Sequence, residues 1–260
     1  MWALEDLQEA PEAITDAMSD ALLLAQERSV PDPVAGWLET WEAWVVAMQA
    51  GSAMFAAAAT TSESVECLIH HEMRLLPASG PRSWVNAGPW INVFYLSVIC
   101  GDKARLDALC EIESSLLQAS GAEFDAYIHP WLEALRSYWL SSPDLGDHLL
   151  QAAQGLAPEA AQISGPETTT KILWPVVDLF HRFVIGDHDQ FNLSLANALT
   201  LRKQYWTGDE GRARDARGLV AVGPLAMASL AYDAGFPIEV ESEYLPSHLL
   251  KRTWVGEFTT

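Results

Sequence analysis

The residues best suited to chemistry are two adjacent histidines followed by a glutamate, His70-His71-Glu72. Imidazole and carboxylate groups bind metals and transfer protons, so this tripeptide is the nearest approach to a metal or catalytic site. Adjacent side chains point to different sides of a helix or a strand, so at most one histidine can join Glu72 in a site. We therefore interpret the histidines as surface or hydrogen-bonded side chains.

A second group of titratable side chains is Asp187-His188-Asp189, which opens a helix expected at residues 188–206. Carboxylates at the start of a helix interact with its positive end, and this capping role explains both aspartates. The sequence contains no glycine-rich phosphate-binding motif, no nucleophile elbow and no H-E-x-x-H zinc motif. We therefore predict no catalytic, metal-binding or cofactor-binding residues, no cofactor, and a protein that is not an enzyme.

Tryptophan is the most frequent aromatic residue, with 11 tryptophans against 8 phenylalanines and 6 tyrosines. Trp37, Trp41 and Trp44 are spaced to stack along one side of a helix expected at residues 33–58. Such rings form a surface for a ligand or protein partner, or they fill the seams between helices, and the second interpretation is favoured for any single ring. Further tryptophans on expected helices are Trp131, Trp139, Trp174 and Trp206.

The charge of the chain limits its partners. With 15 lysines and arginines against 35 aspartates and glutamates among 260 residues, the net charge is −20. A surface of this charge repels nucleic acid and anionic membranes, so neither is an expected partner. It speeds encounter with a basic protein, although general acidity of a cytosolic protein would produce the same composition.

Three cysteines, Cys67, Cys100 and Cys110, are too few and too irregularly spaced for a disulfide framework or a zinc site. We expect buried free thiols in a reducing cytosol. The first residues lack the basic and apolar regions of a signal peptide, which favours a cytoplasmic location. The uncharged stretch from Ala43 to Ser62 is rich in alanine and has no flanking basic cluster, so we expect a buried helix rather than a membrane span.

Apolar residues recur mainly with helical periodicity, which predicts an all-α or mostly α fold. Residues 64–76 are the exception, because an alternating pattern there is compatible with a short β-hairpin. Asp32 and Pro33 are expected to start the second helix, and residues 207–218 are expected to form a mobile surface loop. The expected helices are residues 12–27, 33–58, 84–100, 103–119, 123–141, 145–156, 168–185, 188–206 and 219–235.

Two helix corners have similar sequences, each with a glycine-aspartate pair after an apolar run. In Gly101-Asp102 and Gly186-Asp187 the glycine can adopt the left-handed conformation and the aspartate can cap the next helix. A third pair, Gly146-Asp147, has different neighbours. Similar corners fit antiparallel helix pairs packed in a bundle or a solenoid-like array, although any all-α domain can contain two of them.

The length of the chain fits one large domain or two small ones, and we expect a single helical domain over residues 1–260. The loop Pro77–Pro81 contains a serine-glycine pair between two prolines and is the clearest break along the chain. An N-terminal sub-unit, residues 1–77, would end at this loop.

The C-terminal half carries the most distinctive motifs. They are Asp187-x-x-x-Phe191-x-x-x-Leu195-x-x-Ala198-Leu199, Tyr205-Trp206, Gly223-Pro224-Leu225-Ala226, Ala231-Tyr232-Asp233-Ala234-Gly235-Phe236, Ser242-Glu243-Tyr244-Leu245-Pro246 and Leu249-Leu250. In these motifs the chain resembles the immunity protein 49 family of bacterial polymorphic toxin systems, and the similarity extends back to about residue 30. The resemblance implies a mostly helical, non-enzymatic cytosolic protein that neutralises a toxin by direct binding, and it implies no catalytic residues.

We therefore expect an immunity protein that binds a basic cognate toxin domain through acidic side chains and exposed aromatic rings. The alternative is a tetratricopeptide-like adaptor that binds a peptide or protein in a groove lined by tryptophans. That alternative requires a true repeat, which two similar corners support only weakly. An enzyme that uses His70, Glu72 or the Asp187–Asp189 cluster is the weakest hypothesis. The resemblance does not identify the toxin-binding residues, and the sequence leaves the oligomeric state open.

Overall fold

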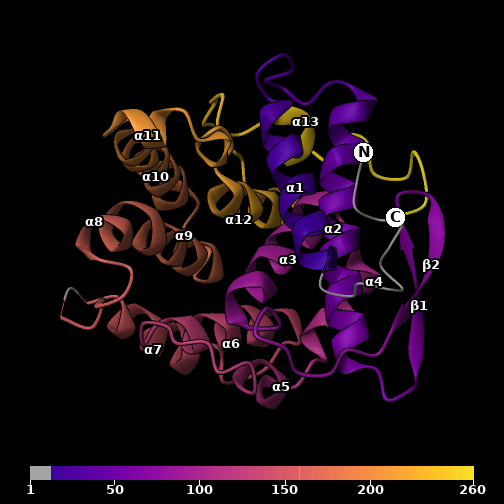
Figure 1. Cartoon of the computed structure of the whole chain (residues 1–260). Coiled ribbons are helices and arrows are strands. Elements are labelled where there is room, and N and C mark those ends of the chain that lie inside the picture. Colours follow the sequence, from indigo (N-terminus) through magenta and orange to yellow (C-terminus); the bar gives the residue numbers. More distant parts are fainter. Residues whose placement is uncertain (1–12, 158) are drawn as a thin grey trace. The chain divides into compact units, whose positions relative to one another are not determined.

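The computed structural model describes residues 13–157 and 159–260, which belong to two compact units (Figure 1). Of the described residues, unit 1 contains those up to Ala122 together with the segment Arg252–Thr260, and unit 2 contains those from Glu123 to Lys251. Both units are mainly helical, as the sequence predicts, and the described residues contain a single two-stranded sheet. The loop Pro77–Pro81 lies inside unit 1.

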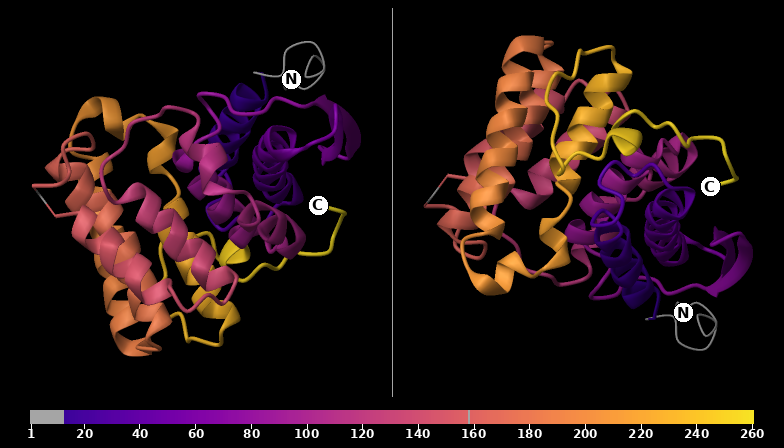
Figure 2. Two further views of the ribbon diagram at one scale, coloured as in Figure 1. Left: turned by 90° about the horizontal axis from the view of Figure 1, so that it is seen from below. Right: turned by 90° about the horizontal axis from the view of Figure 1, so that it is seen from above.

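Unit 1 is organised around α2, Leu38–Ala59, which is buried along most of its length. The helix α1, Ala13–Glu27, runs antiparallel to α2 (Figure 1) and lies beside it (Figure 2), and α3, Ala87–Cys100, also packs against α2. Two shorter helices follow α3, namely α4, Lys103–Cys110, and α5, Ser114–Gln118. Alanine and glycine at many positions of α2 allow neighbouring elements to approach closely.

The uncharged stretch from Ala43 onward is thus part of a core helix, as predicted. No helix among residues 13–157 and 159–260 has both the length and the apolar character needed to cross a bilayer. The three cysteines are buried and free, which confirms that part of the prediction.

The predicted hairpin is present, with β1 at Ser64–Ile69 and β2 at Glu72–Pro77. The strands are antiparallel, and Ile69 pairs with Glu72 across the turn. The two turn residues, His70 and His71, have φ angles of +52° and +64°. Two successive left-handed residues are the geometry of the type I′ turns that close tight hairpins.

Unit 2 contains helix pairs joined by short corners. The helix α6, Ile128–Trp139, packs on α7, Leu145–Gly155, and α9, Trp174–Val184, packs on α10, His188–Trp206. The apolar helix α12, Val222–Asp233, contacts both α9 and α10. The shorter segments are α8, Pro166–Thr168, a π-helical turn at Thr169–Leu173, α11, Glu210–Ala213, a 3-10 turn at Ala216–Gly218, and α13, Ser247–Leu250.

The start of α2 was predicted wrongly. The helix begins at Leu38 rather than at Pro33, because Ala35 adopts a left-handed conformation with φ of +55°. The carboxylate of Asp32 does accept backbone hydrogen bonds, but the donors are Gly36 and Trp37, at 2.8 and 2.9 Å. The aspartate therefore closes a loop instead of capping a helix.

The helix expected at residues 103–119 is divided into α4 and α5. The indole N–H of Trp90 donates to the carbonyl oxygen of Leu109 at 3.1 Å, which engages an acceptor that a continuous helix would use. This bond attaches the end of α4 to α3 at the point where the helix stops.

Two segments of unit 2 also differ from expectation. Residues 207–218, expected as a mobile surface loop, contain α11 and a 3-10 turn, which are capped by the side chains of Asp209 and Asp215. The helix expected at residues 168–185 begins with a π-helical turn just before Pro175. Proline has no N–H to donate, which favours such a local change in the hydrogen-bond pattern.

Candidate partner-binding surfaces

The two adjacent histidines lie in the hairpin turn, and both rings approach the carboxylate of Glu42 on α2. Nε2 of His71 lies 2.6 Å from Oε1 of Glu42, and Nε2 of His70 lies 3.7 Å from the same oxygen. Glu72 pairs with Arg74 instead. The expectation that the histidines diverge is wrong, because the left-handed turn brings both rings to one side.

The Asp187-His188-Asp189 cluster has the capping geometry that the sequence predicts. Oδ1 of Asp187 accepts a hydrogen bond from the backbone N–H of Gln190 at 3.2 Å, at the start of α10. The ring of His188 packs on Phe236 with 3.8 Å between the centroids. Among the residues that the structure describes, no three His, Cys, Asp or Glu side chains are grouped in a way that could hold a metal ion.

The tryptophans divide into core and surface residues. Trp41, Trp44 and Trp131 are buried in helix seams, as the more conservative interpretation predicts. Trp37 and Trp174 are exposed, with 50% and 44% of their surface accessible, and they belong to unit 1 and unit 2 respectively. Trp37 precedes α2, so the three spaced tryptophans do not form one helical stripe.

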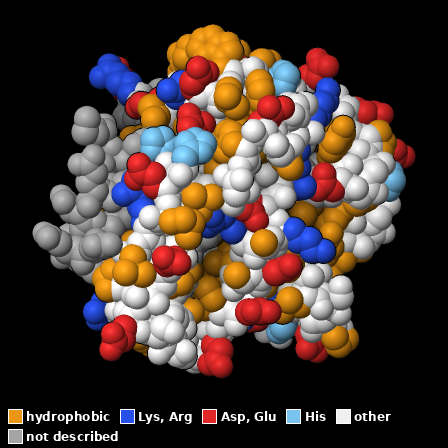
Figure 3. Space-filling view, turned by 90° about the vertical axis from the view of Figure 1, so that its right-hand side faces the viewer, with side chains coloured by type: hydrophobic (Ala, Val, Ile, Leu, Met, Phe, Trp, Pro, Cys, Tyr) orange, Lys and Arg blue, Asp and Glu red, His pale blue; other side chains and the backbone are white. Residues whose placement is uncertain are grey.

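The loop between α1 and α2, together with the first residue of α2, presents four exposed apolar side chains, which we name the loop patch. They are Val30, Val34, Trp37 and Leu38. Hydrophobic side chains gather at the top of Figure 3, at the height of this loop in Figure 1. The backbone beneath the patch is fixed by Asp32, and the indole N–H of Trp254 donates to the carbonyl of Ala35 at 3.0 Å. The loop patch is therefore a preformed apolar surface.

A groove of about 580 Å³ lies between α2, β1 and α4 in unit 1, and we name it the β1 groove. Small side chains on both helices leave this space open. Charged residues also line it, namely Glu66 on β1, Asp102 and Arg105 at the start of α4, and Glu111 beyond its end. The alanines of its lining are Ala53, Ala56, Ala59, Ala104 and Ala108.

One part of the β1 groove is bridged by Arg105. Its Nη2 donates to the carbonyl oxygen of Leu68 on β1, and its Nε donates to Oδ2 of Asp102, both at 3.1 Å. Asp102 also accepts a hydrogen bond from the hydroxyl of Thr260 at 2.9 Å. The sequence predicts only the capping role of Asp102, and its partner Thr260 is distant along the chain.

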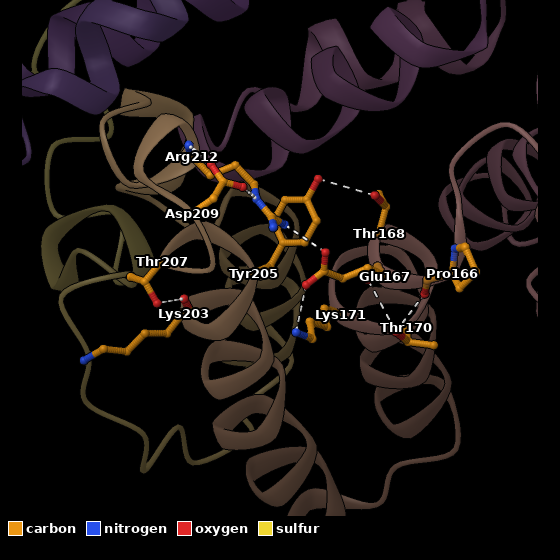
Figure 4. Close-up of polar contacts among 10 residues, drawn as sticks. All are labelled: Pro166, Glu167, Thr168, Thr170, Lys171, Lys203, Tyr205, Thr207, Asp209 and Arg212. Atoms are coloured by element: carbon orange, nitrogen blue, oxygen red, sulfur yellow. Dashed lines mark hydrogen bonds and ion pairs between the residues drawn. The ribbon is translucent and has the colours of Figure 1, made fainter.

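A polar cluster in unit 2 connects α8, α10 and α11 (Figure 4). Arg212 lies over the ring of Tyr205 at 4.3 Å and pairs with Asp209 and Glu167. Hydrogen bonds from Lys171 and Arg212 lower the pKa of Glu167, and those from the backbone and side chain of Arg212 lower the pKa of Asp209. The contacts of Arg212 with Glu167 and Tyr205 attach α11 to α8 and α10.

Arg202 is a buried charged residue that sequence reasoning missed. Its Nη2 donates to the carbonyl oxygens of Arg217 and Val220, at 2.5 and 2.6 Å. Burial lowers the pKa of Arg202 to about 10, so the side chain stays protonated near neutral pH and can hold this turn. Its spacing after Leu195 and Leu199 places Arg202 on the buried face of α10. This spacing is the sequence signal from which its burial could have been predicted.

The family model described as immunity protein 49 matches residues 32–249. The match covers α2, the hairpin, both glycine-aspartate corners and most of unit 2. No curated protein and no solved structure matches the chain.

Proposed function

Because the chain belongs to the immunity protein 49 family, we propose that it protects a bacterial cell by binding a cognate toxin domain in the cytoplasm and blocking its action. The family match over residues 32–249 carries this proposal, since it spans most of both units. Neutralisation by binding is stoichiometric and requires no catalytic residue in the inhibitor.

The charge of the chain supports a basic toxin as the partner. A net charge of −20 attracts a basic domain over a distance set by salt screening, about 8–10 Å at physiological ionic strength. The attraction increases the association rate more than it increases the contact energy. Affinity for the toxin should therefore fall as the salt concentration rises.

The loop patch offers apolar anchors for this complex. Trp37 presents half of its surface to solvent, and its own backbone N–H is held by Asp32. Tryptophan is enriched among residues that dominate binding energy, and a fixed backbone reduces the ordering cost of association. Glu39 is exposed beside the patch and adds negative charge.

Co-expression with the toxin domain encoded beside this chain tests the proposal. We expect restored growth and a stable one-to-one complex, measured by size exclusion with light scattering. Growth arrest despite soluble expression of both proteins, with no complex, would contradict the proposed function.

Two exposed tryptophans provide a matched pair of variants. Trp37→Ala should weaken toxin binding by about 10-fold or more, because it removes the largest anchor of the loop patch. Trp174→Ala removes a similarly exposed ring from unit 2 and should change the affinity by less than about 3-fold. Isothermal titration calorimetry measures both, and equal losses would contradict the assignment of the loop patch.

A further inference from the structure

The strand β1 has one edge that β2 does not pair. The N–H of Ala78 donates to the carbonyl of Glu63 at 2.9 Å, which fixes the phase of the antiparallel ladder. Hydrogen-bonded pairs alternate along such a ladder, so the odd-numbered residues of β1 direct their backbone groups toward β2. The backbone groups of Ser64, Glu66 and Leu68 therefore point to the opposite edge.

Within residues 13–157 and 159–260, side chains satisfy this free edge only near the hairpin turn. Arg105 donates to the carbonyl of Leu68 at 3.1 Å, and Oε1 of Gln49 accepts from the backbone N–H of His70 at 2.9 Å. Farther from the turn, the edge-facing N–H and carbonyl of Glu66 have no hydrogen-bond partner within the described parts of the chain. The β1 groove opens beside these groups.

The β1 groove offers the space and the unpaired backbone groups that an additional strand needs. Paired strands lie about 4.8 Å apart, and a strand added there would be bordered by α2 and α4. The alanines of both helices leave room for side chains of the incoming segment. An extended segment could thus pair with β1 through its backbone and place alternate side chains against the helices.

The charged residues that line the β1 groove indicate which kind of segment could bind in it. Glu66 and Glu111 line the β1 groove and form no ion pair among the described residues. Asp102 and Arg105 neutralise each other, so the groove keeps a net negative rim. A segment with lysine or arginine would complement this rim, whereas a second copy of this acidic chain would place like charges against each other.

We propose that the β1 groove binds an extended, lysine- or arginine-bearing segment of the toxin, which adds to the free edge of β1. The inference rests on the proposed function, because the segment belongs to the toxin that the chain neutralises. It adds a backbone-pairing site to the contact made by the loop patch. The toxin domain encoded beside this chain is the probe for the experiments below.

Glu66→Pro tests the backbone pairing. Proline at this position removes the edge-facing N–H without removing a bond to β2, so the hairpin should keep its stability. We expect toxin affinity to fall by about 10- to 100-fold, while Glu66→Gln, which removes only the charge, should lower it by about 3-fold. Equal affinities of the proline variant and wild type, with both folded, would overturn the inference.

Ala108→Trp tests the space in the β1 groove. A bulky ring on α4 should occupy the groove and lower toxin affinity by about 100-fold. Ala196→Trp places the same ring on an exposed position of α10 in unit 2 and serves as the matched control. Circular dichroism and thermal unfolding should show that both variants are folded.

Hydrogen exchange separates this inference from the proposed function. The backbone amides of Ser64, Glu66 and Leu68, which face the free edge, should exchange rapidly in the free chain and become protected when the toxin binds, whereas the ladder amides of Val65 and Cys67 should be protected in both states. A stable toxin complex without such protection would overturn the groove inference and leave the immunity function in place. Absence of any complex would overturn both, and a toxin-independent dimer abolished by Ala108→Trp would assign the groove to a second copy of the chain.

Discussion

Each unit contains a helix corner made by a glycine-aspartate pair, and the two corners have the same backbone. Gly101 and Gly186 have φ angles of +70° and +73°. In both corners the N–H of the aspartate donates to the carbonyl five residues earlier, at 3.0 Å. The side chains of Asp102 and Asp187 each cap the following helix.

The surroundings of the two corners are different. Cys100, before the first glycine, is 2% exposed, whereas Ile185, before the second, is 54% exposed. The C-terminal segment of unit 1 contacts the first corner, with Val255 beside Gly101 and Thr260 bonded to Asp102. Within the described residues, no atom lies within 4 Å of the position that a Cβ on Gly186 would occupy. A local pattern thus specifies a corner, and more distant residues decide whether it is covered.

The corner between α6 and α7 shows that this backbone does not require glycine. Ser141 adopts φ of +55°, and the N–H of Ser142 donates to the carbonyl of Ser137 at 2.8 Å. Gly146-Asp147, the third pair in the sequence, lies inside α7 instead. These corners share geometry without sharing a sequence repeat.

The largest expected difference between the two corners is in thiol reactivity. Burial raises the pKa of the Cys100 thiol, and the charge of Asp102 raises it further, so the reactive thiolate is scarce and inaccessible. Ile185→Cys places a thiol at the equivalent exposed position. We expect it to react with an aromatic disulfide reagent at least about 10³-fold faster than Cys100 in the folded protein. Comparable reaction rates of the two thiols would show that the first corner opens readily. As a control, the same reagent counts all thiols in the denatured protein.

Loss of the capping aspartate should also affect the corners unequally. Asp102→Ala removes the cap, the pairing with Arg105 and the bond to Thr260, and should lower the free energy of unfolding by about 2–3 kcal/mol. Asp187→Ala removes mainly a cap and should cost about 1 kcal/mol. Urea unfolding measures both values. Equal costs would mean that the bonds to Arg105 and Thr260 add no stability.

Replacing each glycine by alanine should give a smaller difference in the free energy of unfolding between the two corners. Both substitutions place a side chain in the left-handed region, at a cost of about 1 kcal/mol each. A Cβ at Gly101 would also lie 3.1 Å from Val255 and 3.2 Å from Arg252, so Gly101→Ala should cost about 0.5–1 kcal/mol more than Gly186→Ala. Thermal and urea unfolding would detect this difference, and a greater loss for Gly186→Ala would contradict it.

The smallest expected effect belongs to Thr260→Ala. This change removes a single hydrogen bond to Asp102 and should lower the free energy of unfolding by about 0.5–1 kcal/mol. The same change in the Asp102→Ala background should have almost no effect, because the acceptor is already absent. An undiminished effect in that background would assign the role of Thr260 to another contact.

Much of the fold could be predicted from the sequence because its signals are local. The period of apolar residues predicted the bounds of α10, and the alternation around Cys67 predicted the hairpin. The capping roles of Asp102 and Asp187 followed from one glycine and one carboxylate next to a helix. Each of these features depends on hydrogen bonds or burial within a few residues of the signal.

The candidate binding surfaces could be predicted only in part. Aromatic and acidic contacts were expected, but the sequence could not separate exposed Trp37 from buried Trp41, since the two have the spacing of neighbours on one side of a helix. The left-handed Ala35, supported by distant Trp254, decided where α2 begins and left Trp37 in the loop. The β1 groove likewise depends on three elements that meet only in the folded unit.

The sequence by itself determined the helical class, the hairpin, the two glycine-aspartate corners and the family. Each rests on short-range patterns or on matched residue types along the chain. The tertiary structure alone decided which corner is covered, which tryptophans are exposed and where the free edge of β1 opens. The physical reason is that burial and pairing at these places involve residues far apart in sequence, and no local pattern encodes their meeting.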